Sequence, residues 1–352
     1  MRIRLSAAAI VLAWAAVPVA AAAAQAPQPA PQVQGRVLAV PARSSWQHAE
    51  TQMILPPRVA GLNRGEIRDS GEAEMDVMAS YGGTGVFVTL YLFRTGLPDA
   101  ALWYDRAADT ISYQPEYGLA GAPLPAPTAF VRPAAAAASG LRTATDLPGG
   151  PLRSTGIAIA PLGGNHLLKI RMSAQTLDRT ALDALLGRFI EGLRWPAATT
   201  AGERAAVPIA ACPEPLRLRT ARVLRPDMTE SLMDALTGAA AAQPDPDRAA
   251  AIYCREAGSG LQYGVYRPNA SRAAYVVALG DSGIAISLRP AISLEGLVPG
   301  GGRSRVGMTL LQRDSTSVLL SFSRLPPPAQ AVSVAMSGQG SGISVSTEPP
   351  RN

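Results

Sequence analysis

The chain has 352 residues, and 32 basic against 26 acidic residues give it a net charge of +6 at pH 7. Only 5% of the residues are aromatic, and the basic residues are spread along the chain. A nucleic-acid-binding protein usually presents a concentrated basic face with stacking aromatic side chains, so we expect no nucleic-acid partner. The length is sufficient for two domains.

Residues 1–24 have the layout of an export signal. Arg2 and Arg4 give a positive start, an uncharged apolar run follows, and small residues end the segment at Ala24. We expect cleavage after Ala24; a retained membrane anchor is the alternative, because about 20 apolar residues can span a bilayer. A Pro/Gln linker follows over 25–35. No later segment resembles a transmembrane span, so we expect a periplasmic or secreted protein.

The segment 36–197 predicts a first domain that mixes strands and helices. Two runs rich in alternating apolar residues flank the glycines of 82–85, which is typical of a β-hairpin. An apolar stripe at helical spacing predicts a long closing helix that ends before Pro196. The predicted elements are strands at 74–80, 86–93, 126–132, 152–160 and 166–172 and helices at 100–113 and 177–194.

Three features within about residues 50–197 have a recognisable order. A Leu55-Pro56-Pro57 step leads to Gly61-Leu62, the hairpin ends in the run Val88–Leu92, and the closing helix ends in Phe189–Trp195. This order resembles the PsbP-like α/β/α sandwich group. The resemblance implies an antiparallel sheet with helices on both faces, used mostly for binding or assembly, and it transfers no functional residue.

An Ala/Thr/Gly linker is expected over 198–211, followed by a strand-rich α+β domain over 212–352. Turn residues separate a series of short apolar runs in this half. The expected elements are one helix at 228–241 and strands at 249–255, 261–267, 273–279, 283–289, 305–312, 316–323, 330–336 and 342–347. The whole chain is therefore predicted to be an α+β protein of two domains.

Cys212 and Cys254 are the two cysteines of the chain. An even number of cysteines in an exported chain indicates a disulfide, because that compartment oxidises thiols. Two separate buried thiols are the alternative.

The string Gly280-Asp281-Ser282-Gly283 copies part of the trypsin-like active-site serine motif. That chemistry needs a histidine base, and the only histidines are His48 and His166. The same string between two apolar runs is also a good hairpin turn, which is the interpretation we favour. An exported serine hydrolase that uses Ser282 remains the alternative.

Metal and cofactor motifs are incomplete in this sequence. His48-Ala49-Glu50 matches the first part of a zinc deaminase signature, but the Pro-Cys-x-x-Cys part is absent. The glycine-rich segments 82–85 and 300–303 lack the lysine of a phosphate-binding loop. We expect no metal and no cofactor.

Two charged clusters have no assigned chemistry. The densest basic patch contains Arg217, Arg219 and Arg222, and it could contact a phosphate-bearing lipid or polysaccharide or be a solvated strand face. The second is acidic and could bind a cation or protect an edge strand; it contains Glu66, Asp69, Glu72, Glu74 and Asp76. The sequence favours a non-catalytic exported protein that binds a protein partner or a cell-envelope component.

Overall fold

The structure is a computed structural model that describes residues 35–197, 204–225, 228–242, 251–258, 260–291, 305–338 and 340–347. The expected export signal, almost all of the Pro/Gln linker and the glycine segment 300–303 lie outside the described residues. The described residues from Gly35 onward belong to one compact unit. They form a mixed α+β fold, as predicted.

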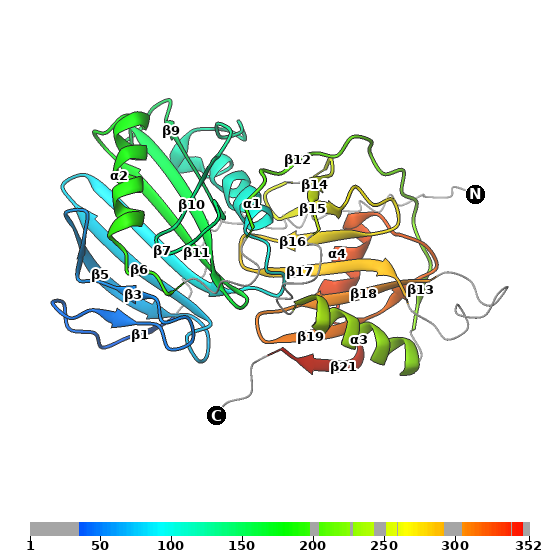
Figure 1. The fold of residues 1–352 in the computed structure, drawn as a ribbon. Helices are drawn as coiled ribbons and strands as arrows, with labels where there is room; N and C mark the ends of the chain where they lie inside the picture. The colour runs from blue at the N-terminus through cyan, green and yellow to red at the C-terminus, as the bar shows by residue number, and fades with distance from the viewer. Residues whose placement is uncertain are drawn as a thin grey trace, which may run out of the picture. The chain divides into compact units, whose positions relative to one another are not determined.

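The first large sheet is antiparallel throughout (Figure 1). Its strands are β1 (Arg36–Val37), β4 (Arg58–Val59), β5 (Leu62–Asp69), β6 (Asp76–Gly83), β7 (Val86–Arg94), β8 (Thr128–Phe130), β9 (Gly140–Asp146), β10 (Ser154–Gly163) and β11 (His166–Ala174). The spatial order is β1-β5-β6-β7-β11-β10-β9-β8, and β4 pairs with β5. A separate small sheet joins β2 (Trp46–Gln47) to β3 (Ile54–Leu55).

Helix α2 (Arg179–Gly192) covers one face of this sheet. The helix begins where the Asp178 carboxylate accepts a hydrogen bond from the Ala181 amide at 2.9 Å, an N-cap that satisfies an otherwise unpaired donor. Its apolar stripe, which includes Leu182, Leu186 and Phe189, is buried against every second residue of the strands. This packing forms the first core of the protein.

Helix α1 (Ala100–Ser112) lies between the two large sheets (Figure 1). It contacts β9 and β10 of the first sheet and β15 (Tyr263–Pro268) of the second. Trp103, fully buried on this helix, belongs to a core that includes Ile157 of the first sheet and Val276 of the second. A short 3-10 helix, η1 (Pro115–Tyr117), follows α1.

The second large sheet is antiparallel except where β12 (Ala210–Ala211) pairs in parallel with β14 (Tyr253–Arg255). The spatial order is β12-β14-β15-β16-β17-β18-β19-β21, and β20 pairs with both β18 and β13. The remaining strands are β13 (Val223–Leu224), β16 (Tyr275–Leu279), β17 (Ile284–Pro290), β18 (Val306–Leu311), β19 (Ser315–Leu319), β20 (Ser321–Phe322) and β21 (Gly340–Ser346).

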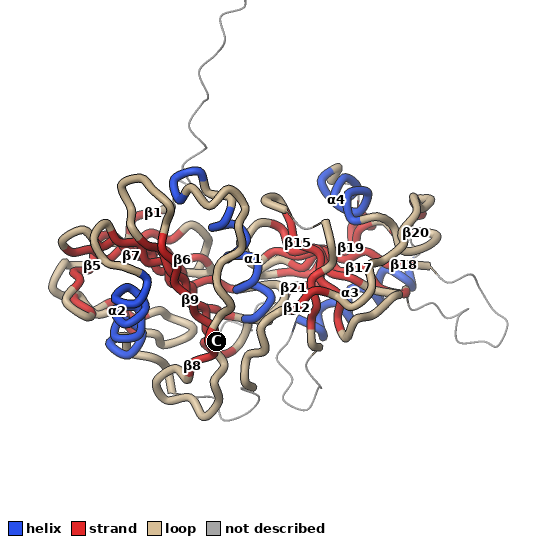
Figure 2. The backbone as a smooth tube through the Cα atoms, turned by 90° about the horizontal axis from the view of Figure 1, so that it is seen from above, coloured by secondary structure: helices blue, strands red, loops and turns tan. Residues whose placement is uncertain are grey.

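Helices α3 (Met228–Ala242) and α4 (Pro328–Met336) cover opposite faces of this sheet (Figure 2). Thr309 lies close to Gly238 of α3, whereas Met308 shares a core with Ala331 of α4. Neighbouring residues of one strand point to opposite faces, so the two helices are separated by the sheet.

The prediction of a strand at 330–336 is wrong, because these residues belong to helix α4. Val332 and Val334 alternate with small residues and imitate a strand, but Pro328 occupies the first turn of a helix, where proline fits well. Strands β5 and β9 were not expected. The end of the expected linker 198–211 forms β12, and the domain boundaries themselves stay predictions.

Candidate functional site

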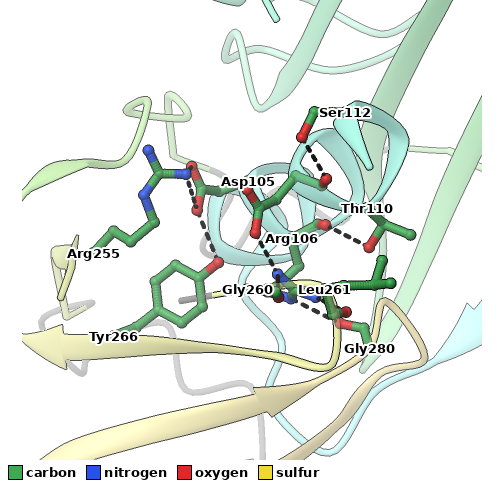
Figure 3. A network of polar contacts seen from close by, with 10 residues as sticks. Asp105, Arg106, Thr110, Ser112, Arg255, Gly260, Leu261, Tyr266 and Gly280 are labelled. Atoms are coloured by element: carbon green, nitrogen blue, oxygen red, sulfur yellow. Dashed lines mark hydrogen bonds and ion pairs between the residues drawn. The ribbon is translucent and has the colours of Figure 1, made fainter. Parts of the chain in front are cut away.

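A buried arginine joins helix α1 to turns of the second sheet (Figure 3). The fully buried Arg106 donates hydrogen bonds to the carbonyl oxygens of Gly280, Gly260 and Leu261 at 3.0, 3.1 and 3.0 Å. Its Nη1 also lies 2.8 Å from the carboxylate of Asp109. Buried charges are tolerated when their donors are satisfied, and Arg106 uses turns of the second sheet for this purpose.

The neighbouring Asp105 makes a second connection (Figure 3). Its carboxylate accepts a hydrogen bond from the Tyr266 hydroxyl at 2.8 Å and lies 3.3 Å from Arg255. Burial raises the pKa of Asp105, whereas Arg255 and Tyr266 favour its ionised form. The polar side chains Asp105 and Arg106 of α1 therefore bind residues of the second sheet and its turns.

The segment Gly280–Gly283 forms the turn between β16 and β17, as the turn interpretation predicted. The Gly283 carbonyl accepts a hydrogen bond from the Gly96 amide at 2.8 Å. Gly283 has a φ of 83°, and a Cβ at this position would lie 2.9 Å from the carbonyl oxygen of Arg94. Glycine is required here for both reasons, because the turn lies directly against the first sheet.

Asp281 of this turn binds two cations of β11. Its Oδ2 lies 2.8 Å from Nζ of Lys169 and 2.6 Å from Nη2 of Arg171. Burial opposes ionisation of Asp281, but Lys169 and Arg171 outweigh it and lower the pKa of the carboxyl to about 2. Lys169 also lies over the ring of Tyr91, with Nζ 4.5 Å from the centroid.

The candidate nucleophile Ser282 donates its hydroxyl to the carbonyl oxygen of Leu279 at 3.0 Å. The structure brings His48 and His166 together, with ring centroids 5.3 Å apart. Neither histidine is among the hydrogen-bond partners of Ser282 in the described part of the chain. The geometry therefore assembles a histidine pair but no serine–histidine pair.

Both histidines are buried. His48 bonds through Nε2 to the Glu74 carbonyl oxygen at 2.9 Å and through Nδ1 to the Thr51 hydroxyl at 2.9 Å. Nδ1 of His166 lies 3.7 Å from Glu50. Burial lowers the pKa of His166 to about 3, with smaller effects from His48 and Arg94, so its imidazole is neutral at neutral pH.

Cys212 and Cys254 form the predicted disulfide. It connects the residue that follows β12 to the centre of β14. Nε of the buried Arg267 lies 3.2 Å from Cys212 Sγ and 3.2 Å from Glu256 Oε2. The disulfide therefore fixes the edge of the second sheet beside a buried ion pair.

The predicted basic residues Arg217, Arg219 and Arg222 are all exposed. Leu216 and Leu218, which alternate with them, pack against the core beneath α4. Residues 213–222 form no strand, although the Arg222 carbonyl accepts a hydrogen bond from the Ser323 amide at 3.0 Å, just before β13.

The acidic cluster before the hairpin is largely engaged in ion pairs and hydrogen bonds. Asp69 is buried and lies 3.7 Å from Arg36, and Asp76 lies 2.8 Å from Arg313 of the second half. Glu74 accepts a hydrogen bond from the Ala49 amide. Among the residues that the structure describes, no group of three or more His, Cys, Asp or Glu side chains could hold a metal ion.

A groove of about 320 Å³ opens on the face of the first sheet opposite α2. Phe87 is 54% exposed at this groove, although its neighbours Val86 and Val88 are buried on the other face of β7. The lining comes from β7, β11, η1 and the loop before β10, and consists of Phe87, Thr89, Tyr91, Glu116, Tyr117, Leu152, Arg171 and Ser173.

The groove combines aromatic rings with hydrogen-bonding groups, and Glu116 adds one carboxylate to its lining. Its Arg171 is already paired with Asp281, and burial raises the pKa of Tyr91, which keeps the phenol neutral. Thr89 and Ser173 supply hydroxyl groups beside the rings. Such a lining suits a ligand with both apolar faces and polar edges.

One pattern in the sequence of β7 (Val86–Arg94) indicates this groove. β7 places Phe87, Thr89 and Tyr91 on the face opposite its core residues, and an aromatic outer face differs from the polar outer face expected of a half-buried strand.

No protein-family model, curated protein or solved structure matches this chain. Within the described ranges, no helix combines the length and the apolar character needed to cross a bilayer.

Proposed function

We propose that this chain is an exported, non-catalytic protein that binds a component of the cell envelope in the groove of the first sheet. The observation that carries the proposal is the exposed ring of Phe87 at a groove shared with Tyr91 and Tyr117. Exposed aromatic rings beside hydroxyl groups favour the flat, apolar faces and polar edges of a sugar chain. An envelope glycan is therefore the ligand class that fits best, and a protein partner is the alternative.

Export is supported by the layout of residues 1–24 and by the disulfide between Cys212 and Cys254. The antiparallel first sheet, with α2 on one face and α1 on the other, supports membership of the PsbP-like group. The proposed location is the periplasm or the medium outside the cell. Among the described residues, the Ser282 hydroxyl bonds to the Leu279 carbonyl and to neither histidine, which does not favour the serine hydrolase alternative.

The proposal is tested by sedimentation of the purified protein with insoluble cell-wall glycan. We expect the wild-type protein to sediment with the glycan, and Phe87→Ala to bind at least tenfold more weakly. Val131→Ala is the matched control, because Val131 is 55% exposed but is not among the groove residues. Equal binding by wild type and Phe87→Ala, or no binding by either, would contradict the proposal.

A parallel capture from solubilised envelope proteins separates the two ligand classes. If a protein is captured by the wild type and lost with Phe87→Ala, while glycan binding is absent, the groove binds a protein and the glycan assignment is wrong. Because Phe87 is more than half exposed, its replacement should leave the fold intact, which circular dichroism can check.

A further inference from the structure

One carboxylate of the groove lining has no cationic partner. Glu116 is exposed at the groove, and within the described part of the chain no ion pair joins it to an arginine, a lysine or a histidine. The cation of the lining, Arg171, instead lies 2.6 Å from Asp281. Glu116 is therefore available to a cationic group that the ligand supplies.

A short closed turn holds Glu116 next to an aromatic ring. The helix η1 begins with Pro115, whose fixed φ suits the first position of a helix, and Gly118 ends it in the left-handed region at a φ of 63°. The Gly118 amide donates a hydrogen bond to the Pro115 carbonyl oxygen at 3.2 Å. Because the neighbouring Tyr117 also lines the groove, this turn presents both a carboxylate and a phenol ring to the ligand.

The Glu116 carboxylate is oriented by a neutral group. The side-chain amide of Gln114 donates hydrogen bonds to the two carboxylate oxygens at 2.8 and 3.2 Å. Each carboxylate oxygen can accept more than one hydrogen bond, so this contact leaves capacity for a donor of the ligand. A neutral amide also leaves the negative charge of Glu116 uncompensated.

The aromatic rings of the groove add to the attraction for an ammonium group. The face of a ring attracts an ammonium that lies within about 6 Å of its centroid. Tyr91 already has Nζ of Lys169 at 4.5 Å from its centroid, so Phe87 and Tyr117 are the rings that remain for the ligand. A calcium ion fits this lining poorly, because it takes about six to eight oxygen ligands. A single ammonium group suits one carboxylate beside these rings.

We propose that Glu116 makes the groove selective for a glycan with free amino groups over the same glycan with its amino groups acetylated. This inference rests on the proposed function and names the class of sugar chain that is bound. The protonated amine of a glucosamine unit would donate to the Glu116 carboxylate and lie against the ring of Phe87 or Tyr117. An N-acetylated unit carries no charge at that position and gains neither attraction.

The test is calorimetric titration of the purified protein with soluble tetramers of glucosamine and of N-acetylglucosamine, at neutral pH and low salt. We expect the wild type to bind the glucosamine tetramer about tenfold more tightly, because an exposed ion pair contributes up to about fivefold and a ring face about twofold. Added salt should reduce this preference, since it screens the charges. Equal affinity for the two tetramers would overturn the inference and leave the proposed function standing.

Variants identify the residue that carries the preference. Glu116→Gln should lower the preference to about twofold and leave the affinity for the N-acetylated tetramer unchanged, whereas a merely structural role would weaken both tetramers. Glu191→Gln is the matched control: it removes the same charge from an exposed position of α2, on the other face of the first sheet, and should keep the wild-type preference. An unchanged preference in Glu116→Gln would also overturn the inference.

Two further outcomes separate this inference from the proposed function. If the wild type binds neither tetramer but still sediments with cell-wall glycan, the preference for amino groups is wrong and glycan binding stands. If it binds neither the tetramers nor the cell-wall glycan, the proposed function fails and the inference fails with it. Phe87→Ala should weaken the binding of both tetramers, because Phe87 contacts the sugar chain whether or not its amino groups are acetylated.

Discussion

The ammonium group of Lys169 lies 2.8 Å from the Asp281 carboxylate, across the junction between the two large sheets. Lys169 is the only lysine of the chain and is almost completely buried. Arg171 shares the same carboxylate at 2.6 Å, so one acidic side chain of the second sheet pairs with two cations of the first. The stability of the junction should therefore depend on the Asp281 carboxylate and its two cations more than on any exposed ion pair.

Replacing Asp281 with asparagine should lower the free energy of unfolding by about 3 kcal/mol, because it leaves the buried Lys169 and its neighbour Arg171 without their shared carboxylate. The measurement is urea denaturation of the purified protein. The double variant Lys169→Met/Asp281→Asn is the control, and it should be less destabilised than the sum of the two single variants. Additive effects would show that the two groups do not interact.

His166 should make the protein less stable in mild acid. Its pKa is about 3 in the folded protein and 6.5 ordinarily, so the unfolded chain binds the proton more readily as the pH falls below 6.5. The free energy of unfolding should therefore be about 2 kcal/mol lower at pH 5 than at pH 7. Urea denaturation at both pH values should show a smaller loss for His166→Phe. Arg217→Gln, a substitution at an exposed position, should show the same difference in free energy of unfolding between pH 7 and pH 5 as the wild type. If His166→Phe also shows the wild-type difference, the prediction is wrong.

Removal of the disulfide should destabilise the protein by about 4 kcal/mol, because the bond closes a long loop in the unfolded chain. Cys212 and Cys254 are 42 positions apart. We expect Cys212→Ser/Cys254→Ser to match the wild type measured in reductant, and to be insensitive to reductant itself. If reductant leaves the wild-type denaturation curve unchanged, the disulfide contributes no stability.

Ser282 should be unreactive toward a serine-directed fluorophosphonate probe, because its hydroxyl bonds to its own turn and has no histidine partner among its described contacts. The free energy of unfolding of Ser282→Ala should agree with that of the wild type to within about 0.5 kcal/mol. Covalent labelling of the wild type, lost in Ser282→Ala, would restore the hydrolase alternative.

Features that depend on local pattern were predictable from the sequence. The hairpin of β6 and β7 and the helix α1 follow from alternation and helical spacing in neighbouring residues. β5 was not recognised, because its pairing with β6 shifts between Arg64 and Ile67 and this irregularity interrupts the alternation. Arg64 is also buried there and bonds to the Leu55 carbonyl, against the usual placement of charge.

The candidate sites depend on contacts between distant residues. Lys169 and Asp281 are 112 positions apart, and no local pattern relates a strand residue to a turn in another sheet. The groove likewise combines β7 with η1 and β11. The disulfide was predictable because only two cysteines exist, so the choice of partners needed no geometry.

The position of α1 has a consequence for how the gene could be divided. The helix is encoded within 36–197, yet its Arg106 finds its carbonyl partners at 260, 261 and 280. A fragment that stops at residue 197 would expose Trp103 and leave a buried guanidinium without those partners, and a fragment that begins at 212 would lack the helix that covers β15. The two halves are therefore poor candidates for separate expression, for recombination with other domains, or for inheritance as independent modules.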